Sequence, residues 1–316
     1  MKKLLLFTFI SVLLAFAGFC LSPQYKQKSF IGQKIFPDLR TQLDLIDGIH
    51  IFSKHGEIVI AKNADDVFVI PEKADLPARG DRVKNIILGA AMLEYFEKKT
   101  GDAYNFKELS LQDISDDKEN KAVRLVIKAK DKVVFDMILG REKFGLSGFS
   151  NGIFVRHPDD MQVWLARRFF DATGNVMTFI NNVFPKIPDA DVKTVTIKQK
   201  ENKVELKDGK KFPDLFGFFD DLSFYDAVKD EGQKVIAEYE FKVKGGITVN
   251  VYKIKAEKGN PYIKVTVARG KAVTDEGLKL YSVMRDFEGR LYKIPADSLS
   301  RLPEIKNDKK RGKTVQ

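Results

Sequence analysis

Cysteine is nearly absent from the chain, because Cys20 is the only one. The part of the chain after residue 20 therefore forms no disulfide and has no thiol nucleophile or thiolate metal ligand. Its stability has to come from hydrophobic cores, which a chain of 316 residues with 44% hydrophobic composition can bury.

Histidine is scarce as well, and its three positions form no metal-binding or acid-base pattern. His50 alternates with isoleucines on an expected strand, His55 lies in an expected turn, and His157 precedes a proline in another turn. No pair has the four-residue helical spacing, with a carboxylate between, that is typical of a metal site. We therefore expect neither a metal nor a cofactor.

Other features that could support catalysis are better explained as structural. Adjacent aspartates at 65–66, 116–117 and 159–160 fall in expected turns, and the pair at 220–221 falls on the polar face of an expected helix. None of these pairs resembles two carboxylates held across a cleft. The glycine-dense segment 145–152 lacks the following helix of a phosphate loop, so we interpret it as a hairpin connection or a partner-binding loop. No catalytic residue is predicted.

Long apolar runs are absent except at residues 4–21, which follow two lysines. A helix of this length reaches about 27 Å, close to the roughly 30 Å hydrocarbon core of a bilayer. The run is either a retained signal anchor or a signal peptide cleaved after Ala17, and a lipid anchor on Cys20 is a weaker alternative. Each interpretation keeps the lysines in the cytoplasm and exports the rest of the chain. We expect an inner-membrane protein with one anchor and a periplasmic bulk, or, after cleavage, a soluble periplasmic protein.

Charge of one sign does not dominate any long segment, although 54 basic residues exceed 44 acidic ones and the net charge is +10. Basic and acidic residues alternate nearly everywhere, which is typical of solvated strands and turns. Only residues 306–313 concentrate positive charge, and they belong to an expected basic, disordered tail that could contact anionic headgroups. Nucleic acid is not an expected partner, because no recognised motif accompanies the charge.

Alternating apolar patterns predict strands in the first half of the chain, and one longer pattern predicts a helix. Strands meet at the turn 53–56, a third strand covers 66–70, and apolar residues spaced by three and four predict a helix over 80–97. The strands expected after this helix are 122–129, 133–139, 152–157 and 161–166.

The second half repeats this order of patterns. Its first hairpin has the apolar spacing of the earlier one, with Val195, Ile197, Val204 and Leu206 in the places of Ile49, Ile51, Ile58 and Ile60. A helix then opens at Pro213, residues 263–270 match 133–140, and Arg285 matches Arg156.

The repeated order predicts an α+β fold with antiparallel sheets, in which two tandem units of hairpin, helix and β-meander follow an N-terminal hydrophobic helix. The expected parts are the signal anchor or signal peptide 1–21, the connector 22–43, the repeats 44–171 and 190–302, and the tail 303–316.

Several short motifs resemble the bacterial domain-of-unknown-function family 4340. They are Gly-Gln-Lys-Ile-Phe-Pro at 32–37, Leu-Gly-Arg at 139–141, Gly-Ile-Phe-Val-Arg at 152–156 and Gln-Val-Trp-Leu at 162–165. The resemblance covers roughly residues 30 to 200 and departs from the family at Phe68, where a Trp is expected, and at Phe154, where a Tyr is usual. It implies a single-anchor envelope protein associated with ABC-type transporter components, and it supplies no catalytic residues.

Four residues are the candidates for a partner surface. Arg156 and Arg285 take matching places in the two repeats, and the aromatic pair Trp164 and Tyr292 joins them because arginine, tryptophan and tyrosine often anchor interfaces. The alternative for each arginine is a charge at the solvent-exposed end of a strand.

The sequence therefore predicts a non-catalytic, membrane-anchored accessory protein whose partner is an envelope protein such as an ABC permease or ATPase complex. The alternatives are a periplasmic hydrolase with a cleft between the two repeats and a binder of acidic envelope polymer.

Overall fold

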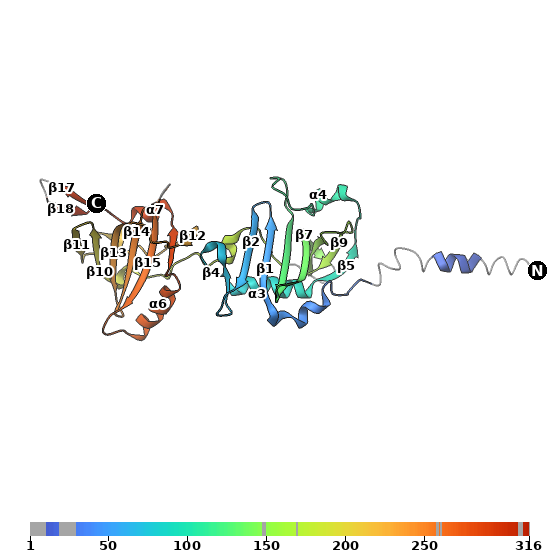
Figure 1. Cartoon of the computed structure of the whole chain (residues 1–316), viewed down its shortest axis with the longest axis horizontal. Helices are drawn as coiled ribbons and strands as arrows, with labels where there is room; N and C mark the ends of the chain where they lie inside the picture. Colours follow the sequence, from blue (N-terminus) through green and yellow to red (C-terminus); the bar gives the residue numbers. More distant parts are fainter. Residues whose placement is uncertain are drawn as a thin grey trace, which may run out of the picture. The chain divides into compact units, whose positions relative to one another are not determined.

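The computed structural model describes residues 11–18, 30–146, 150–168, 170–256, 259, 261–308 and 312–315 (Figure 1). The chain divides into two compact units. Unit 1 comprises Met1–Ile70 and Pro77–Phe179, and unit 2 comprises Pro71–Leu76 and Ile180–Gln316. Among the described residues, unit 1 is built on a nine-stranded antiparallel sheet and unit 2 on a seven-stranded one with an additional two-stranded hairpin, and the helices are few and short. The fold is therefore β-rich, and the expected antiparallel sheets are confirmed.

The sheet of unit 1 has the strand order β4-β3-β2-β1-β6-β7-β8-β9-β5. Its strands are β1 (Ile46–Ser53), β2 (Gly56–Lys62), β3 (Phe68–Ile70), β4 (Leu76–Pro77), β5 (Glu94–Lys98), β6 (Val123–Ala129), β7 (Lys132–Leu146), β8 (Ser150–Arg156) and β9 (Trp164–Arg167). The helical segments of this part of the chain are η1 (Pro37–Thr41), η2 (Leu43–Leu45), η3 (Pro71–Lys73), α3 (Gly80–Met92), η4 (Ala103–Asn105), α4 (Phe106–Leu109) and η5 (Val176–Phe179).

The core of unit 1 follows from strand alternation. Ile49 pairs with Ile60 and Ile51 with Ile58, as the spacing predicts, and all four side chains are buried. Helix α3 contributes buried apolar side chains from one stripe, including Val83 and Ile86.

The expected helix over 80–97 is too long. Helix α3 ends at Met92, Leu93 is extended, and residues 94–98 form the edge strand β5 paired with β9. Apolar spacing continues through Leu93 and Phe96, but the aromatic residues at 95 and 96 favour a strand, and pairing with β9 decides the outcome.

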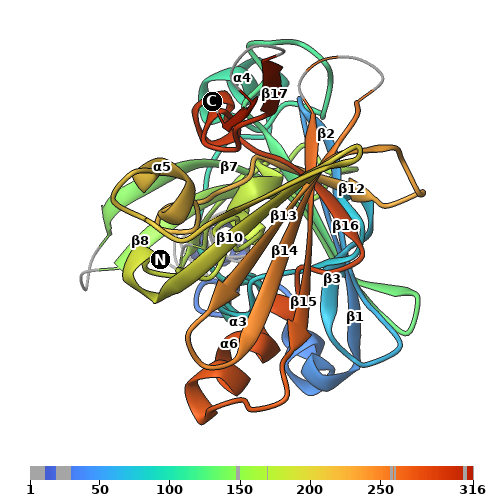
Figure 2. The ribbon, with the colours of Figure 1, turned by 90° about the vertical axis from the view of Figure 1, so that its left-hand side faces the viewer.

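The sheet of unit 2 has the strand order β11-β10-β13-β14-β15-β16-β12, and Figure 2 shows β10, β13, β14 and β15 side by side. Its strands are β10 (Val192–Gln199), β11 (Asn202–Leu206), β12 (Asp226–Lys229), β13 (Val235–Val243), β14 (Ile247–Ile254), β15 (Tyr262–Arg269) and β16 (Arg290–Lys293). The helices are η6 (Asp189–Asp191), α5 (Pro213–Phe216), α6 (Asp275–Arg285) and α7 (Ala296–Ser300).

Three parts of unit 2 differ from the expectation. The helix opened by Pro213 has only four residues, and Asp220 and Asp221 lie in a bend beyond it. Helix α6 was not expected. The segment expected to be a disordered tail contains the hairpin of β17 (Ile305–Asp308) and β18 (Gly312–Val315), and the backbone leading into it accepts a 2.9 Å hydrogen bond from the Tyr239 hydroxyl at the Pro303 carbonyl.

Residues 71–76 come from the first half of the sequence but belong to unit 2. Arg290 donates hydrogen bonds to the carbonyls of Ala74 (2.7 Å) and Asp75 (3.0 Å), and Lys73 pairs with Asp226 at 2.9 Å. Ala74 and Asp75 both have positive φ, so these charged contacts stabilise a turn that non-glycine residues rarely adopt.

The two sheets share one strand order once β3 and β4 are set aside. Ile49 and Val195 hold equivalent positions in the first hairpin of each unit. When the residue pairings are followed from these two positions across each sheet, Trp164 becomes the counterpart of Tyr292. The same pairings make Lys264, rather than Arg285, the counterpart of Arg156. The pairings also match β7 with β14. The expected match of 133–140 with 263–270 is therefore wrong by one strand, because 263–269 belong to β15. Period-two alternation is the same in every strand, and sequence spacing could not reveal this shift.

The N-terminal apolar run lies largely outside the described residues. Only 11–18 of it is described, as a helix. Within the described parts of the chain, no helix combines the length and apolar character needed to cross a membrane. The connector expected over 22–43 is described from residue 30 onward.

Candidate functional site

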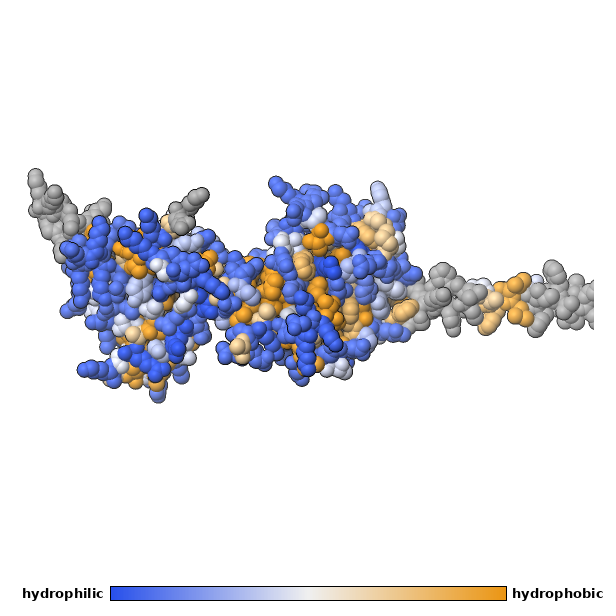
Figure 3. Space-filling view, viewed as in Figure 1, coloured by the Kyte–Doolittle hydropathy of each residue, from blue (hydrophilic) through white to orange (hydrophobic). Residues whose placement is uncertain are grey.

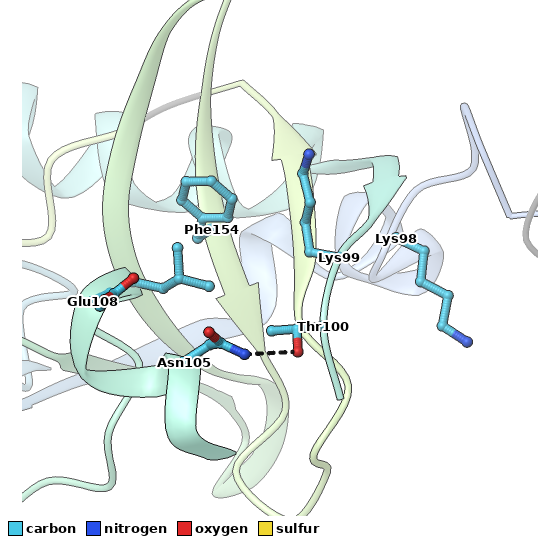
Figure 4. A pocket seen from close by; sticks show the side chains of 7 residues that line it. Lys98, Lys99, Thr100, Asn105, Glu108 and Phe154 are labelled. Carbon is cyan, nitrogen blue, oxygen red and sulfur yellow. Dashed lines mark hydrogen bonds between the residues drawn. The ribbon is translucent and has the colours of Figure 1, made fainter. Parts of the chain in front are cut away.

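A pocket of about 460 Å³ opens on unit 1 beside the end of β5 (Figure 4). Strand β5, the segment that follows it, α4 and β8 all contribute to its wall. The lining residues are Lys98, Lys99, Thr100, Asn105, Glu108, Leu109 and Phe154.

The base of the pocket is apolar and firmly supported. Phe154 is 7% exposed and belongs to a buried cluster that includes Phe106, Leu111 and Leu165. Leu109 packs against the same cluster. Because close-packed cores resist rearrangement, the base is a preformed surface.

The rim of the pocket is polar. The Asn105 side-chain amide donates a 3.2 Å hydrogen bond to the Thr100 hydroxyl, drawn in Figure 4. Lys99 pairs with Glu97 at 2.7 Å, and Lys98 points away from the other labelled side chains. The lining contains a single carboxylate and neither histidine, serine nor cysteine. The apolar base together with the hydrogen-bonding rim suits recognition of an apolar group by contact and hydrogen bonding.

Arg156 is a buried structural residue beside this pocket. Its side chain is 3% exposed, and it donates to the carbonyls of Leu111 (2.7 Å) and Pro158 (2.8 Å) while pairing with the Asp113 carboxylate. Its guanidinium lies 4.6 Å from the ring centroid of Phe106. Arg156 therefore joins the segment after α4 to the turn after β8, and it does not lie on the solvent face where either interpretation of the sequence put it.

Trp164 and Tyr292 have matching register positions but different surroundings. Trp164 is partly exposed and contacts Tyr95 at 4.7 Å between ring centroids. Tyr292 is fully buried among aromatic rings such as Phe184, and its hydroxyl donates a 2.9 Å hydrogen bond to the Phe287 carbonyl. Burial raises the pKa of Tyr292 to about 12, so its hydroxyl stays protonated. Tyr292 is a core residue and offers no surface to a partner.

Arg285 is exposed at the last residue of α6, with its guanidinium 5.9 Å from the Tyr281 ring centroid. The register counterpart of Arg156, Lys264, instead pairs with Asp230 at 2.6 Å. The four residues expected to share a partner surface thus include two buried ones, and the match of Arg285 with Arg156 is wrong.

The other titratable groups fit structural roles. His50 lies 2.6 Å from a carboxylate oxygen of Glu57, across the first hairpin. Asp221 forms two hydrogen bonds with Arg301, and these lower the pKa of Asp221. Among the described residues, no group of three histidine, cysteine or acidic side chains could hold a metal.

The open face of the unit 1 sheet is a feature that the sequence patterns did not reveal. Phe52 and Val59, which are partly exposed, and Val126, which is buried, point away from the core isoleucines on this face, and Figure 3 shows apolar side chains interrupting the hydrophilic surface over β1, β2 and β7. On the corresponding face of unit 2, Lys198 pairs with Glu238 at 2.8 Å.

Sequence patterns also missed the residues that form the pocket. Strand β5 was hidden in the expected helix, although the aromatic pair at 95–96 was a signal for a strand. Comparison of the chain with protein-family models, curated proteins and solved structures gives no match.

Proposed function

We propose that the chain is a non-catalytic, membrane-anchored interaction protein of the cell envelope, with both units on the outer side of the cytoplasmic membrane. The lysines at positions 2 and 3 and the apolar run 4–21 support this topology, since positive charge favours the cytoplasmic side. We further propose that the two units descend from one duplicated α+β unit, as their common strand order suggests.

The pocket beside β5 is the observation that carries the proposal. Its apolar base and hydrogen-bonding rim suit an apolar side chain presented by a partner protein. The motifs that resemble family 4340 favour a subunit of an ABC-type transporter complex as this partner.

Site-directed photo-crosslinking in native membranes tests the partner. A photoreactive residue at Glu108, which is exposed on the pocket rim, is expected to capture a permease or ATPase subunit of an ABC-type transporter. The matched control is Glu205, an exposed glutamate on β11 of unit 2. Capture of the same proteins from both positions, or capture of no transporter subunit from Glu108, would contradict the proposal.

Topology is tested separately with reporters fused to the C-terminus. A reporter that is active only outside the cytoplasm is expected to work, and one that is active only inside is expected to fail. The opposite result would refute the extracytoplasmic assignment. The mass of the mature N-terminus then separates a retained anchor from cleavage after Ala17.

A further inference from the structure

Three aromatic rings form a partly open cluster at the edge of unit 1. The Trp164 ring centroid lies 4.7 Å from that of Tyr95 and 6.0 Å from that of Phe30, and Phe30 lies 5.9 Å from Tyr95. Phe30 is 44% exposed, and the neighbouring Ile31 is 46% exposed. Large apolar side chains that gather and stay open at one place usually mark a contact surface.

The backbone holds this cluster in place. The amide of Gly32 donates to the Tyr95 carbonyl (2.8 Å), and the Tyr95 amide donates to the Gln33 carbonyl (3.0 Å). The amide of Ile35 donates to the Leu93 carbonyl at 3.0 Å. Residues 32–35 therefore run along the start of β5, and Phe30 is fixed against the two rings contributed by β5 and β9.

The cluster is close in sequence to the apolar run. Residues 22–29 separate Leu21 from Phe30, and a fully extended chain of this length spans at most about 30 Å. These eight residues include two lysines and no acidic residue. If the run 4–21 enters the bilayer, the cluster has to lie within this distance of the point where the chain leaves it.

The charges of β5 beside the cluster suit a lipid surface. The two carboxylates of β5 have lysine partners, Glu94 with Lys34 at 2.7 Å and Glu97 with Lys99 at 2.7 Å. Lys98, which pairs with Trp164 in the sheet register, has no carboxylate partner among the residues that the structure describes. A lysine of this kind can contact an anionic headgroup, while tryptophan and tyrosine favour the headgroup region.

We infer that Phe30, Ile31, Tyr95 and Trp164 form a membrane-contact surface that rests on the bilayer entered by residues 4–21. This inference depends on the proposed anchoring. It goes beyond anchoring because it states which surface of unit 1 faces the lipid and which headgroup chemistry that surface favours. A protein that covers the cluster instead of lipid is the alternative occupant.

Trp164 permits a direct test, because it is the only tryptophan of the chain. The full chain is reconstituted into vesicles of phosphatidylethanolamine and phosphatidylglycerol in which part of the lipid carries brominated acyl chains. We expect Trp164 emission to fall as the brominated fraction rises and to be protected from iodide in the water. Flotation is measured on the same sample. Protein that floats with the vesicles is anchored in them.

Two variants test the apolar contact, and one serves as a control. Ile31→Ser changes an exposed side chain and should reduce quenching by brominated lipid, and Phe30→Ser with Ile31→Ser should reduce it further. Phe144→Ser replaces a side chain that is 68% exposed on β7 and should leave quenching unchanged. Circular dichroism on each variant verifies that unit 1 is folded.

The outcomes separate the inference from the proposed function. Flotation with efficient quenching by brominated lipid supports both. Flotation with Trp164 quenched by iodide and not by lipid overturns the membrane contact but keeps the anchor. Absence of flotation overturns both. Equal quenching in the wild type and in the Phe30 and Ile31 variants would also overturn the contact assigned to these side chains.

Discussion

The two units share one strand order but differ in the faces of their sheets that point away from the buried side. Phe52, Val59 and Val126 of unit 1 correspond by register to Lys198, Glu205 and Glu240 of unit 2. Most buried strand positions, by contrast, are apolar in both sheets. The comparison teaches that the inner face specifies this topology, while the outer face is free to serve a different role in each unit.

Substitution of Gly140 is expected to give the largest change in stability among these comparisons of the two units. A Cβ at this position would overlap with the carbonyl oxygen of Leu109 and the side chain of Leu111, whereas its register counterpart in unit 2 is the buried Ile254. We expect Gly140→Ala to lower the free energy of unfolding by about 3 kcal/mol, because overpacking forces the backbone apart. Urea unfolding measures this loss.

Gly80→Ala is the control for that variant, since nothing lies within 4 Å of a Cβ at position 80. Its effect should stay within about 0.5 kcal/mol. A neutral Gly140→Ala would mean that the segment after α4 does not pack on β7 in solution.

Arg156 and its counterpart Lys264 provide the second comparison. Arg156→Ala leaves the carbonyls of Leu111 and Pro158 without their donor and should cost about 2 kcal/mol. Lys264→Ala removes a side chain that is 31% exposed and pairs with Asp230, and it should cost less than about 1 kcal/mol. Thermal unfolding of both variants measures the difference, and equal losses would refute the structural role assigned to Arg156.

The ion pairs of Asp226 predict that the stability of unit 2 depends on pH in a way that unit 1 does not share. Burial alone would raise the pKa of Asp226, but hydrogen bonds and charges from Lys73 and Lys293 outweigh burial and lower it. A lowered pKa stabilises the fold above the unfolded value of 3.8, and this contribution is lost as the pH falls through the lower folded value. Asp226→Asn should therefore cost about 1 kcal/mol at pH 7 and make the stability less dependent on pH below about 4.

The register counterpart of Asp226 in unit 1 is Glu97, whose pair with Lys99 is more exposed. Glu97→Gln should change the free energy of unfolding by less than about 0.5 kcal/mol. Unfolding followed at several pH values distinguishes the two sites, and a pH profile unchanged by Asp226→Asn would contradict the role of this carboxylate.

A modest gain in stability is expected at matching turns. Lys130 and Asp131 join β6 to β7 with φ of 50° and 63°, while Gly245 and Gly246 serve the β13–β14 turn with φ of 85° and 77°. Replacing Lys130→Asn together with Asp131→Gly should stabilise unit 1 by about 1 kcal/mol, because these residues favour the type I′ turn. Chemical denaturation measures the gain. A loss of stability would show that the lysine or aspartate side chain makes a contact that outweighs backbone strain.

Sequence patterns predicted the parts of the fold that depend on local alternation. The register of Ile49 with Ile60 and of Val195 with Leu206 followed from period-two spacing bounded by turns. Helix α3 was predicted but overextended, because Leu93 and Phe96 fit the helical period and only pairing with β9 converts 94–98 into a strand. Local patterns carry no information about such distant pairing.

The candidate site was predicted less well, for a related reason. Arg156 was chosen for its residue type and its matching place, and Tyr292 for its residue type, but burial depends on the segments that cover them, such as the chain after α4 for Arg156. Trp164 was identified as an aromatic position of interest, whereas its neighbours Phe30 and Tyr95 lie far away in sequence. Contacts of this range emerge only when the sheet is assembled.

The short bridge between residues 32–35 and β5 also has a mechanical consequence. If residues 4–21 are held in a bilayer, tension on the tether acts first on the hydrogen bonds that join Gly32 and Gln33 to Tyr95 and Ile35 to Leu93. Detaching this segment would uncover backbone groups along the free edge of β5, and an uncovered edge can accept another strand. Tension on the anchor would thereby control whether the β5 edge of unit 1 can bind a strand of another protein.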